Sequence, residues 1–339
     1  MSAPLELRLD VYGLRVGVAG DWDDVVADVR RDLAWFEAPG DGPIDLLIQV
    51  TRRPPDYAPY GGLSASFVTP RNVVFQDGAN TVIDYFGRAL LVLERDRASA
   101  HVQGEDPAVV REAVGNLVIS RVGEHLNAQG LVRLHAIGLS GPAGAVAVVM
   151  PSGGGKSTLA LRALEDERFR ILSEDSPLID RNGLAHPFPL RIGINPTDAA
   201  LVPVGYSTRL VERLEFHPKL VLDVAQFRER IESAPRPLRH LVIGRRTLRE
   251  VARLEPLPRR RATGALLREA VVGVGVYQGM EFVLQKGWGD VLGKSGTAAR
   301  RARVAGAVLR RATVWQLSLG RDRESNWQAL CPLLEGDAV

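Results

Sequence analysis

A glycine-rich run, residues 150–158 (MPSGGGKST), contains the residues of this chain that are best suited to binding phosphate. Its three glycines let successive backbone N–H groups turn toward one anion, the lysine can reach terminal phosphates, and the serine hydroxyl can bind Mg²⁺. The apolar run Ala145–Val149 and the helical pattern Leu159–Leu164 are the strand and helix that must hold such a loop. The predicted nucleotide-binding residues are Ser152, Gly153, Gly154, Gly155, Lys156, Ser157 and Thr158.

One position departs from the usual phosphate-loop pattern. The pattern G-x-x-x-x-G-K-[ST] has glycine where this chain has Met150, so the loop must open without its first glycine. A plain glycine turn is the alternative interpretation. The strand before the loop and the helix after it favour the phosphate site.

A histidine and an acidic pair stand on either side of this loop in the sequence. We expect Leu131–Leu139 and Ala145–Val149 to form a hairpin through residues 140–144, which places His135 in mid-strand, twenty-one residues before Lys156. Residues 169–180 begin with an apolar strand that ends in Glu174 and Asp175. A carboxylate at the end of a neighbouring strand can bind Mg²⁺ or accept a proton from an attacking hydroxyl. Alternatively, the histidine is an ordinary core residue, and the acids form the metal site of an ATPase.

Composition limits the classes of protein that this chain can belong to. Its 339 residues, of which 45% are hydrophobic, are enough for two domains with cores of their own. No apolar run approaches the ~20 residues that span a bilayer, and the N-terminus lacks signal-peptide features. A single cysteine, Cys331, excludes an internal disulfide. We therefore expect a cytoplasmic protein without a membrane partner. The net charge is only +3 and no nucleic-acid motif is present, so we expect no nucleic-acid partner.

The first 128 residues are predicted to form an N-terminal α/β domain that positions no chemistry of its own. Period-two alternation predicts strands, and Trp22–Phe36 has the pattern of an amphipathic helix. Asp106 is expected to cap a second helix, with Pro107 at its first position and its end near residues 127–130. The predicted strands cover residues 5–12, 44–50, 66–69, 72–76, 81–86 and 89–94.

Residues 129–339 are predicted to form the phosphate-loop domain. Its later elements are strands at 239–246 and 313–319, helices at 263–272, 295–309 and 324–334, and a flexible stretch at 286–296.

The order of His135, the glycine loop and the acidic pair resembles HPr kinase/phosphorylase and the related kinases that phosphorylate lasso peptides. The phosphate loop of this group also resembles that of phosphoenolpyruvate carboxykinase. The resemblance covers about residues 130–330. It implies a C-terminal HPr kinase-like domain built on a central mixed sheet, which residues 214–223 continue. Together with the N-terminal mixed α/β domain predicted from alternation, the expected fold class is α/β.

The resemblance also implies ATP and Mg²⁺ as cofactors. The catalytic residues that it implies are Asp175, His135 and Glu174, with Asp175 as the base, and the metal-binding residues are Ser157 and Asp175. Two departures from the family pattern stand out. The first acid is Glu174 rather than aspartate, and residues 187–195 lack the family's glutamate before the Arg-Gly pair.

The expected function is that of an ATP-dependent kinase. It transfers the γ-phosphoryl group to a hydroxyl, that of serine in the first place, on a peptide, a protein or a small natural-product precursor. Relatives in the group form oligomers, so a homo-oligomer is also an expectation. The alternative is a P-loop ATPase or nucleotide switch that acts on a partner protein, because such loops serve all of these classes.

Overall fold

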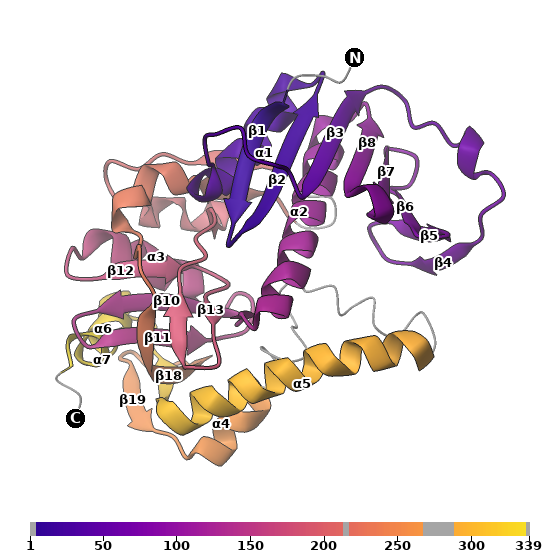
Figure 1. Ribbon diagram of the computed structural model, residues 1–339. Helices are drawn as coiled ribbons and strands as arrows, with labels where there is room; N and C mark the ends of the chain where they lie inside the picture. Colours follow the sequence, from indigo (N-terminus) through magenta and orange to yellow (C-terminus); the bar gives the residue numbers. More distant parts are fainter. Residues whose placement is uncertain (1–4, 213–216, 267–287, 337–339) are drawn as a thin grey trace.

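The computed structural model describes residues 5–212, 217–266 and 288–336, and it shows a mixed α/β protein with two large sheets (Figure 1). The first sheet has the strand order β1-β2-β3-β8-β7-β6-β5-β4. Its strands are β1 (Leu5–Val11), β2 (Leu14–Gly20), β3 (Leu46–Arg52), β4 (Ala65–Val68), β5 (Val73–Asp77), β6 (Asn80–Asp84), β7 (Ala89–Glu94) and β8 (Ser99–Gly104). β2, β3 and β8 run parallel to one another, and the other neighbouring pairs are antiparallel.

Two helices, α1 (Asp23–Leu33) and α2 (Pro107–Gln129), pack against this sheet and against each other. The predicted cap is confirmed: the Asp106 side chain accepts hydrogen bonds from the backbone of Ala108 and Val109, at 3.0 and 3.2 Å. The helix ends at Gly130, whose φ of 80° is a left-handed conformation that glycine adopts at little cost. The six strands predicted in this region are present. The sequence reading missed β2 and β8.

The second sheet has the order β12-β10-β11-β18-β14-β13-β9, and β20 joins it beside β18 and β19. β11, β18 and β20 are parallel and the other pairs are antiparallel, so the sheet is mixed. Its strands are β9 (Val132–Arg133), β10 (Ala136–Gly141), β11 (Gly144–Val149), β12 (Arg170–Ser173), β13 (Leu178–Ile179), β14 (Leu184–His186), β18 (Arg236–Arg246), β19 (Arg253–Pro256) and β20 (Thr313–Leu319).

Helices cover both faces of this sheet, so its central strand β11 is buried along its whole length. Val146 and Val148 face a core that includes α3 (Lys156–Glu165), α6 (Arg323–Gln328) and α7 (Cys331–Glu335). The alternate residues Ala145, Ala147 and Val149 face α4 (Arg259–Leu266) and α5 (Trp288–Arg311). The continuous apolar run before the glycine loop is the pattern of a strand that is covered on both sides.

The prediction of one strand over Leu131–Leu139 is wrong, because the chain changes partners at His135. β9 pairs with β13, and β10 pairs with β11 and β12. Between them, the amide of Leu134 donates to the carbonyl of Pro177, and that of Ala136 donates to the carbonyl of Asp175. His135 therefore lies in the gap between two ladders, next to the backbone that carries the acidic pair.

The prediction that residues 214–223 continue the central sheet is also wrong. β17 (Lys219–Leu222) pairs on one side with β15 (Ile192–Ile194) and on the other with β16 (Arg209–Val211), in a separate three-stranded sheet. Both edges of β17 are occupied, so it has no free edge for the central sheet. Residues 214–216 of the predicted segment lie outside the described residues.

Local predictions in the C-terminal region had mixed outcomes. β20 has the predicted bounds, and β18 begins three residues earlier than predicted. The prediction of a flexible stretch at 286–296 is wrong for residues 288–296, which belong to α5, and residues 286–287 lie outside the described part. Of the helix predicted at 263–272, residues 267–272 also lie outside the described part. The terminal helix is two helices, α6 and α7, with Pro332, which has no backbone N–H to donate, in the first turn of α7.

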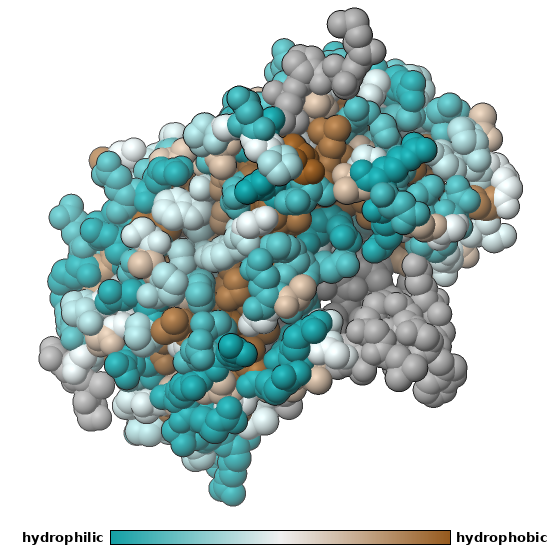
Figure 2. Space-filling model, in the orientation of Figure 1, coloured by the Kyte–Doolittle hydropathy of each residue, from teal (hydrophilic) through white to brown (hydrophobic). Residues whose placement is uncertain are grey.

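The visible face is mostly hydrophilic, with hydrophobic side chains in small patches between polar ones (Figure 2). None of the helices in the described ranges is both long and apolar enough to cross a membrane.

Candidate phosphate-binding site

The glycine loop joins the end of β11 to the start of α3, as its sequence pattern predicts. Gly153 and Gly155 have φ values of +73° and +116°, which residues with a side chain rarely adopt. The amide of Gly154 donates to the carbonyl of Pro151 at 2.9 Å, and a Cβ on Gly154 would lie 2.8 Å from that oxygen. The tight turn thus requires all three glycines. It leads directly into the N-terminus of α3, where free backbone N–H groups favour an anion.

The structure explains why the first glycine of the usual pattern is not needed. Met150 is not among the described residues with positive φ, so its backbone tolerates a side chain. That side chain is 1% exposed and lies over Gly244 of β18: a Cβ on Gly244 would be 2.5 Å from the Met150 Cγ. The methionine therefore fills space that a glycine in the neighbouring strand leaves open.

Lys156 is buried at the start of α3, with 6% of its surface exposed. Its Nζ donates to Nε2 of His135 at 2.8 Å and to the carbonyl of Met150 at 3.1 Å. The same ammonium lies 3.6 Å from Oδ1 of Asp175. An ammonium with so few water contacts keeps much of its electrostatic strength for an anion in the loop.

His135 lies between Lys156 and Asp175 and is itself buried. An ammonium can only donate, so Nε2 of a neutral His135 ring accepts from Lys156 and the ring proton is on Nδ1. Nδ1 lies 3.4 Å from Oδ1 of Asp175, yet without hydrogen-bond geometry to any described partner. A buried polar atom without such a partner is uncommon and is often found at functional sites. The Asp175 side chain is 41% exposed, so it is open to a ligand.

Glu174 points to a different partner from Asp175. The hydroxyl of Ser157 donates to Oε1 of Glu174 at 2.6 Å. The residue is half-buried. This burial, together with the charge of Asp175, raises the pKa of Glu174 to about 7, against the effects of the Ser157 hydrogen bond and the Lys156 and Lys219 charges.

The structure therefore brings the predicted residues together, but the side chains of Glu174 and Asp175 contact different partners. Sequence reasoning assigned Mg²⁺ to Ser157 and Asp175, whereas the Ser157 hydroxyl bonds Glu174. Asp175 contacts His135 and Lys156 instead. Of the remaining loop residues, Ser152 and Gly153 are exposed at its tip, and Thr158 is half-buried in the first turn of α3.

These residues fit a nucleotide with its magnesium ion. The glycine turn, the α3 N-terminus and the Lys156 ammonium suit a polyphosphate. The Ser157 hydroxyl and the Glu174 carboxyl provide the hard oxygen atoms that Mg²⁺ prefers. Within the described ranges, no three histidine, cysteine or acidic side chains could hold a metal by themselves. A metal here would thus need phosphate and water oxygens as well, which is how Mg²⁺ usually binds with nucleotides.

Sequence reasoning did not include two cations near this site. Arg133 of β9 is 4% exposed, and Gly123 of α2 leaves room for its guanidinium. Burial and the neighbouring charge of Arg301 lower the pKa of Arg133 to about 10, while the charge of Asp175 acts in the opposite direction. Lys219 is the second, on β17. No spacing rule identifies Arg133, whereas the rarity of lysine in this chain could have directed attention to Lys219.

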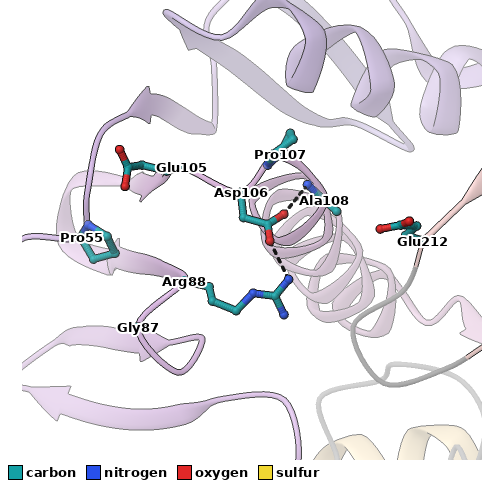
Figure 3. A pocket seen from close by; sticks show the side chains of 8 residues that line it. All are labelled: Pro55, Gly87, Arg88, Glu105, Asp106, Pro107, Ala108 and Glu212. Atoms are coloured by element: carbon teal, nitrogen blue, oxygen red, sulfur yellow. Dashed lines mark hydrogen bonds and ion pairs between the residues drawn. The ribbon is translucent and has the colours of Figure 1, made fainter.

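A cavity of about 630 Å³ lies elsewhere, at the N-terminal end of α2 (Figure 3). Glu105, Asp106 and Glu212 contribute its acidic groups, and Arg88 is paired with Asp106 at 2.6 Å. The acidic groups make the charge of this lining mainly negative, whereas a phosphate site requires positive charge. The glycine loop, and not this cavity, is therefore the candidate site.

No protein-family model matches this chain, and no curated protein matches it either.

Proposed function

We propose that this protein is an ATP-dependent kinase, similar to HPr kinase/phosphorylase, that transfers the γ-phosphoryl group to a hydroxyl of a peptide, a protein or a small precursor. A serine hydroxyl is the first candidate acceptor. The observation that carries the proposal is the contact of Lys156 and His135 with one exposed carboxylate, Asp175, beside a glycine loop. This geometry supports the proposal because Lys156 could bind a phosphate while the neighbouring Asp175 serves as a base that an acceptor can reach.

Phosphoryl transfer asks a protein mainly to position the reactants and to neutralise charge. When bound, Mg·ATP supplies the phosphoryl group, with the metal offsetting charge on the phosphates. The loop amides and Lys156 hold the terminal phosphates, and Ser157 with Glu174 supplies the protein oxygens for Mg²⁺. Because the Lys156 ammonium donates hydrogen bonds to His135 and to the Met150 carbonyl, its position is fixed before a ligand enters.

Asp175 accepts the proton of the acceptor hydroxyl. Its carboxylate is partly exposed, whereas Lys156 and His135 are buried, so an acceptor that approaches the loop meets Asp175 first. His135 is close enough to Asp175 to orient the carboxylate through Nδ1. In this arrangement Glu174 binds the metal and Asp175 accepts the proton of the acceptor. The two adjacent carboxylates thus have different roles because they have different partners.

An ATPase or nucleotide switch would use the same loop with water as the acceptor. The two classes differ in what happens to the phosphoryl group, so labelled ATP separates them. The protein is incubated with γ-labelled ATP, Mg²⁺ and a panel of serine peptides and small alcohols. We expect label on a hydroxyl acceptor, and we expect Asp175→Asn and His135→Ala to lose it. Asp96→Asn, at an exposed residue in the short 3-10 helix between β7 and β8, is the matched control and should transfer normally.

Acceptor-independent hydrolysis that survives Asp175→Asn would refute the kinase mechanism in favour of the ATPase. Failure of the wild-type protein to bind ATP would refute both.

A further inference from the structure

The second sheet brings several strand ends to one edge, beside the glycine loop. β11, β18 and β20 are parallel, and β12 runs in the same direction because β10 is antiparallel to both β11 and β12. β11 and β18 lie side by side (Figure 1). β11 leads into the glycine loop, β12 leads to Asp175, and β18 ends at Arg246. Arg246 therefore stands at the edge of the sheet where ligands of α/β proteins commonly bind.

Strand alternation directs the Arg246 side chain to the face of the sheet that α3 covers. Val242 of β18 lies in the same buried core as residues of α3. Two residues further on, Gly244 lies against the Met150 side chain, where the glycine loop begins. Because alternate residues of a strand point to the same face, Arg246 points to this face as well, whereas Arg245 points to the opposite one.

The register of the sheet places Arg246 next to the last glycine of the loop. Arg246 lies opposite Leu319 of β20, at the spacing of about 4.8 Å that separates neighbouring strands. The Leu319 side chain packs on the loop: a Cβ on Gly155 would lie 3.7 Å from its Cδ2, and a Cβ on Gly244 would lie 3.4 Å from its Cδ1. Leu319 thus extends from β20 to the glycine loop on the face to which Arg246 points.

The Arg246 guanidinium is available to a ligand, as far as the described residues show. The residue is exposed, and within the described ranges its side chain has no hydrogen-bond partner and no ion pair within 4.0 Å. Two other arginines at this edge, Arg253 and Arg321, are by contrast paired with Glu255 and Glu250. The positive charge of Arg246 is therefore the one that these neighbouring acids leave for another anion.

Lys156 and Arg246 lie on opposite sides of the strand that carries the loop. In the order β12-β10-β11-β18, β11 carries the glycine loop. The Lys156 ammonium extends toward β10, where it contacts His135, and toward Asp175 after β12. Arg246 belongs to β18, on the other side of β11. A chain of phosphates along the loop would thus have a cation on either side.

We propose that Arg246 binds the phosphates that remain on ADP after transfer, on the side of the glycine loop away from Asp175. This inference rests on the proposed nucleotide site. The γ-phosphoryl group must lie near the base Asp175, so the other phosphates extend away from it. A guanidinium suits them because its donors form a planar fork that can bind two phosphate oxygens, and its charge offsets the charge that develops on the leaving ADP.

The test compares the affinities of Mg·ATP and Mg·ADP, measured by calorimetry, for Arg246→Met and the wild-type protein. We expect Arg246→Met to weaken both nucleotides by a similar factor of roughly ten, which is about 1.4 kcal/mol, because charge-assisted hydrogen bonds to the phosphates they share are lost. Arg246→Lys should retain part of the affinity, since the charge remains but the fork is lost.

The matched control is Arg245→Met, which removes the same charge one residue away. The Arg245 side chain is on the opposite face, where its Nε donates to the Ser318 hydroxyl at 3.2 Å. This variant should change the affinity of neither nucleotide by more than about twofold. An equal loss for Arg245→Met and Arg246→Met would overturn the proposal, because the effect would be one of general charge and not of the face that Arg246 occupies.

Arg246→Gln provides a second neutral variant, and circular dichroism shows whether each variant is folded. If both neutral variants bind Mg·ATP and Mg·ADP as tightly as the wild type while Lys156→Met loses binding, the role of Arg246 is overturned and the proposed nucleotide site stands. A loss for Mg·ATP without a loss for Mg·ADP would also overturn it, because the contact would then be to the γ-phosphate. If the wild-type protein binds no nucleotide, both proposals fall.

Discussion

Replacing Glu174 by glutamine should remove a pH-dependent part of the stability of the nucleotide-free protein. The pKa of this carboxyl is raised from 4.5 to about 7 in the folded protein, chiefly by burial. Between these values the folded state holds a proton that the unfolded state has released. Stability from this group is therefore complete below pH 4.5 and is lost as pH rises through 7. At about 1.36 kcal/mol per pKa unit, the difference between the two pKa values corresponds to about 3 kcal/mol of unfolding free energy.

Urea denaturation of both proteins, in buffers without metal or nucleotide, measures this contribution directly. Glutamine cannot ionise but can still accept a hydrogen bond from Ser157, so the variant keeps the contact while losing the titration. The difference in unfolding free energy, wild type minus Glu174→Gln, should fall by about 2 kcal/mol between pH 5.5 and pH 8.5. Most of the change should occur below pH 7.5.

The control is Glu165→Gln, at the end of α3, where the carboxylate is 41% exposed and paired with Arg162. The difference in unfolding free energy between the wild type and Glu165→Gln should stay nearly constant over the same pH range. A difference for Glu174→Gln that is equally flat, or that grows with pH, would refute the reasoning, because the carboxyl would then be ionised in the folded protein at neutral pH.

Three further changes test the supports of the site by urea denaturation. Asp32→Asn should destabilise the protein by about 3 kcal/mol, because it breaks a largely buried ion pair with arginines, among them Arg111, which is 7% exposed. Asp28→Asn, one turn earlier on α1 and more exposed, should cost under about 1 kcal/mol, and equal losses for the two would contradict the role of the buried network. Gly155→Ala should cost about 1–2 kcal/mol through backbone strain at φ +116°, since the added methyl group meets only Leu319 at an ordinary 3.7 Å; an unchanged stability would show that the loop relaxes. Asp106→Ala should cost about 1 kcal/mol by removing the α2 cap, and Asp106→Asn, which still caps, should recover much of it.

Much of the site could be predicted from the sequence because its features are local. The glycine turn follows from residues that tolerate positive φ, and the strand before it and the helix after it follow from apolar periodicity within a few residues. The cap at Asp106 and the bounds of β20 were predictable for the same reason. Each of these depends on neighbours in the chain, which a sequence displays directly.

The partners within the site depended on the tertiary structure. The two acids are adjacent in sequence, and only the path of the chain after β12 directs Glu174 to Ser157 and Asp175 to His135. The strand break at His135 arises because the backbone of residues 175–177 bonds there, forty residues further along the chain. Spacing and periodicity contain no information on such pairings, since a ladder's register is set by long-range packing.

The sequence by itself thus determined that a glycine loop stands between a buried strand and a helix, with a histidine before it and two acids after it. The tertiary structure decided which groups meet. It placed β17 in a smaller sheet beside α3 and not in the central sheet. The physical reason is that backbone conformation is encoded residue by residue, whereas the charges that surround a ligand come from strands distant in the chain, and packing alone brings these together.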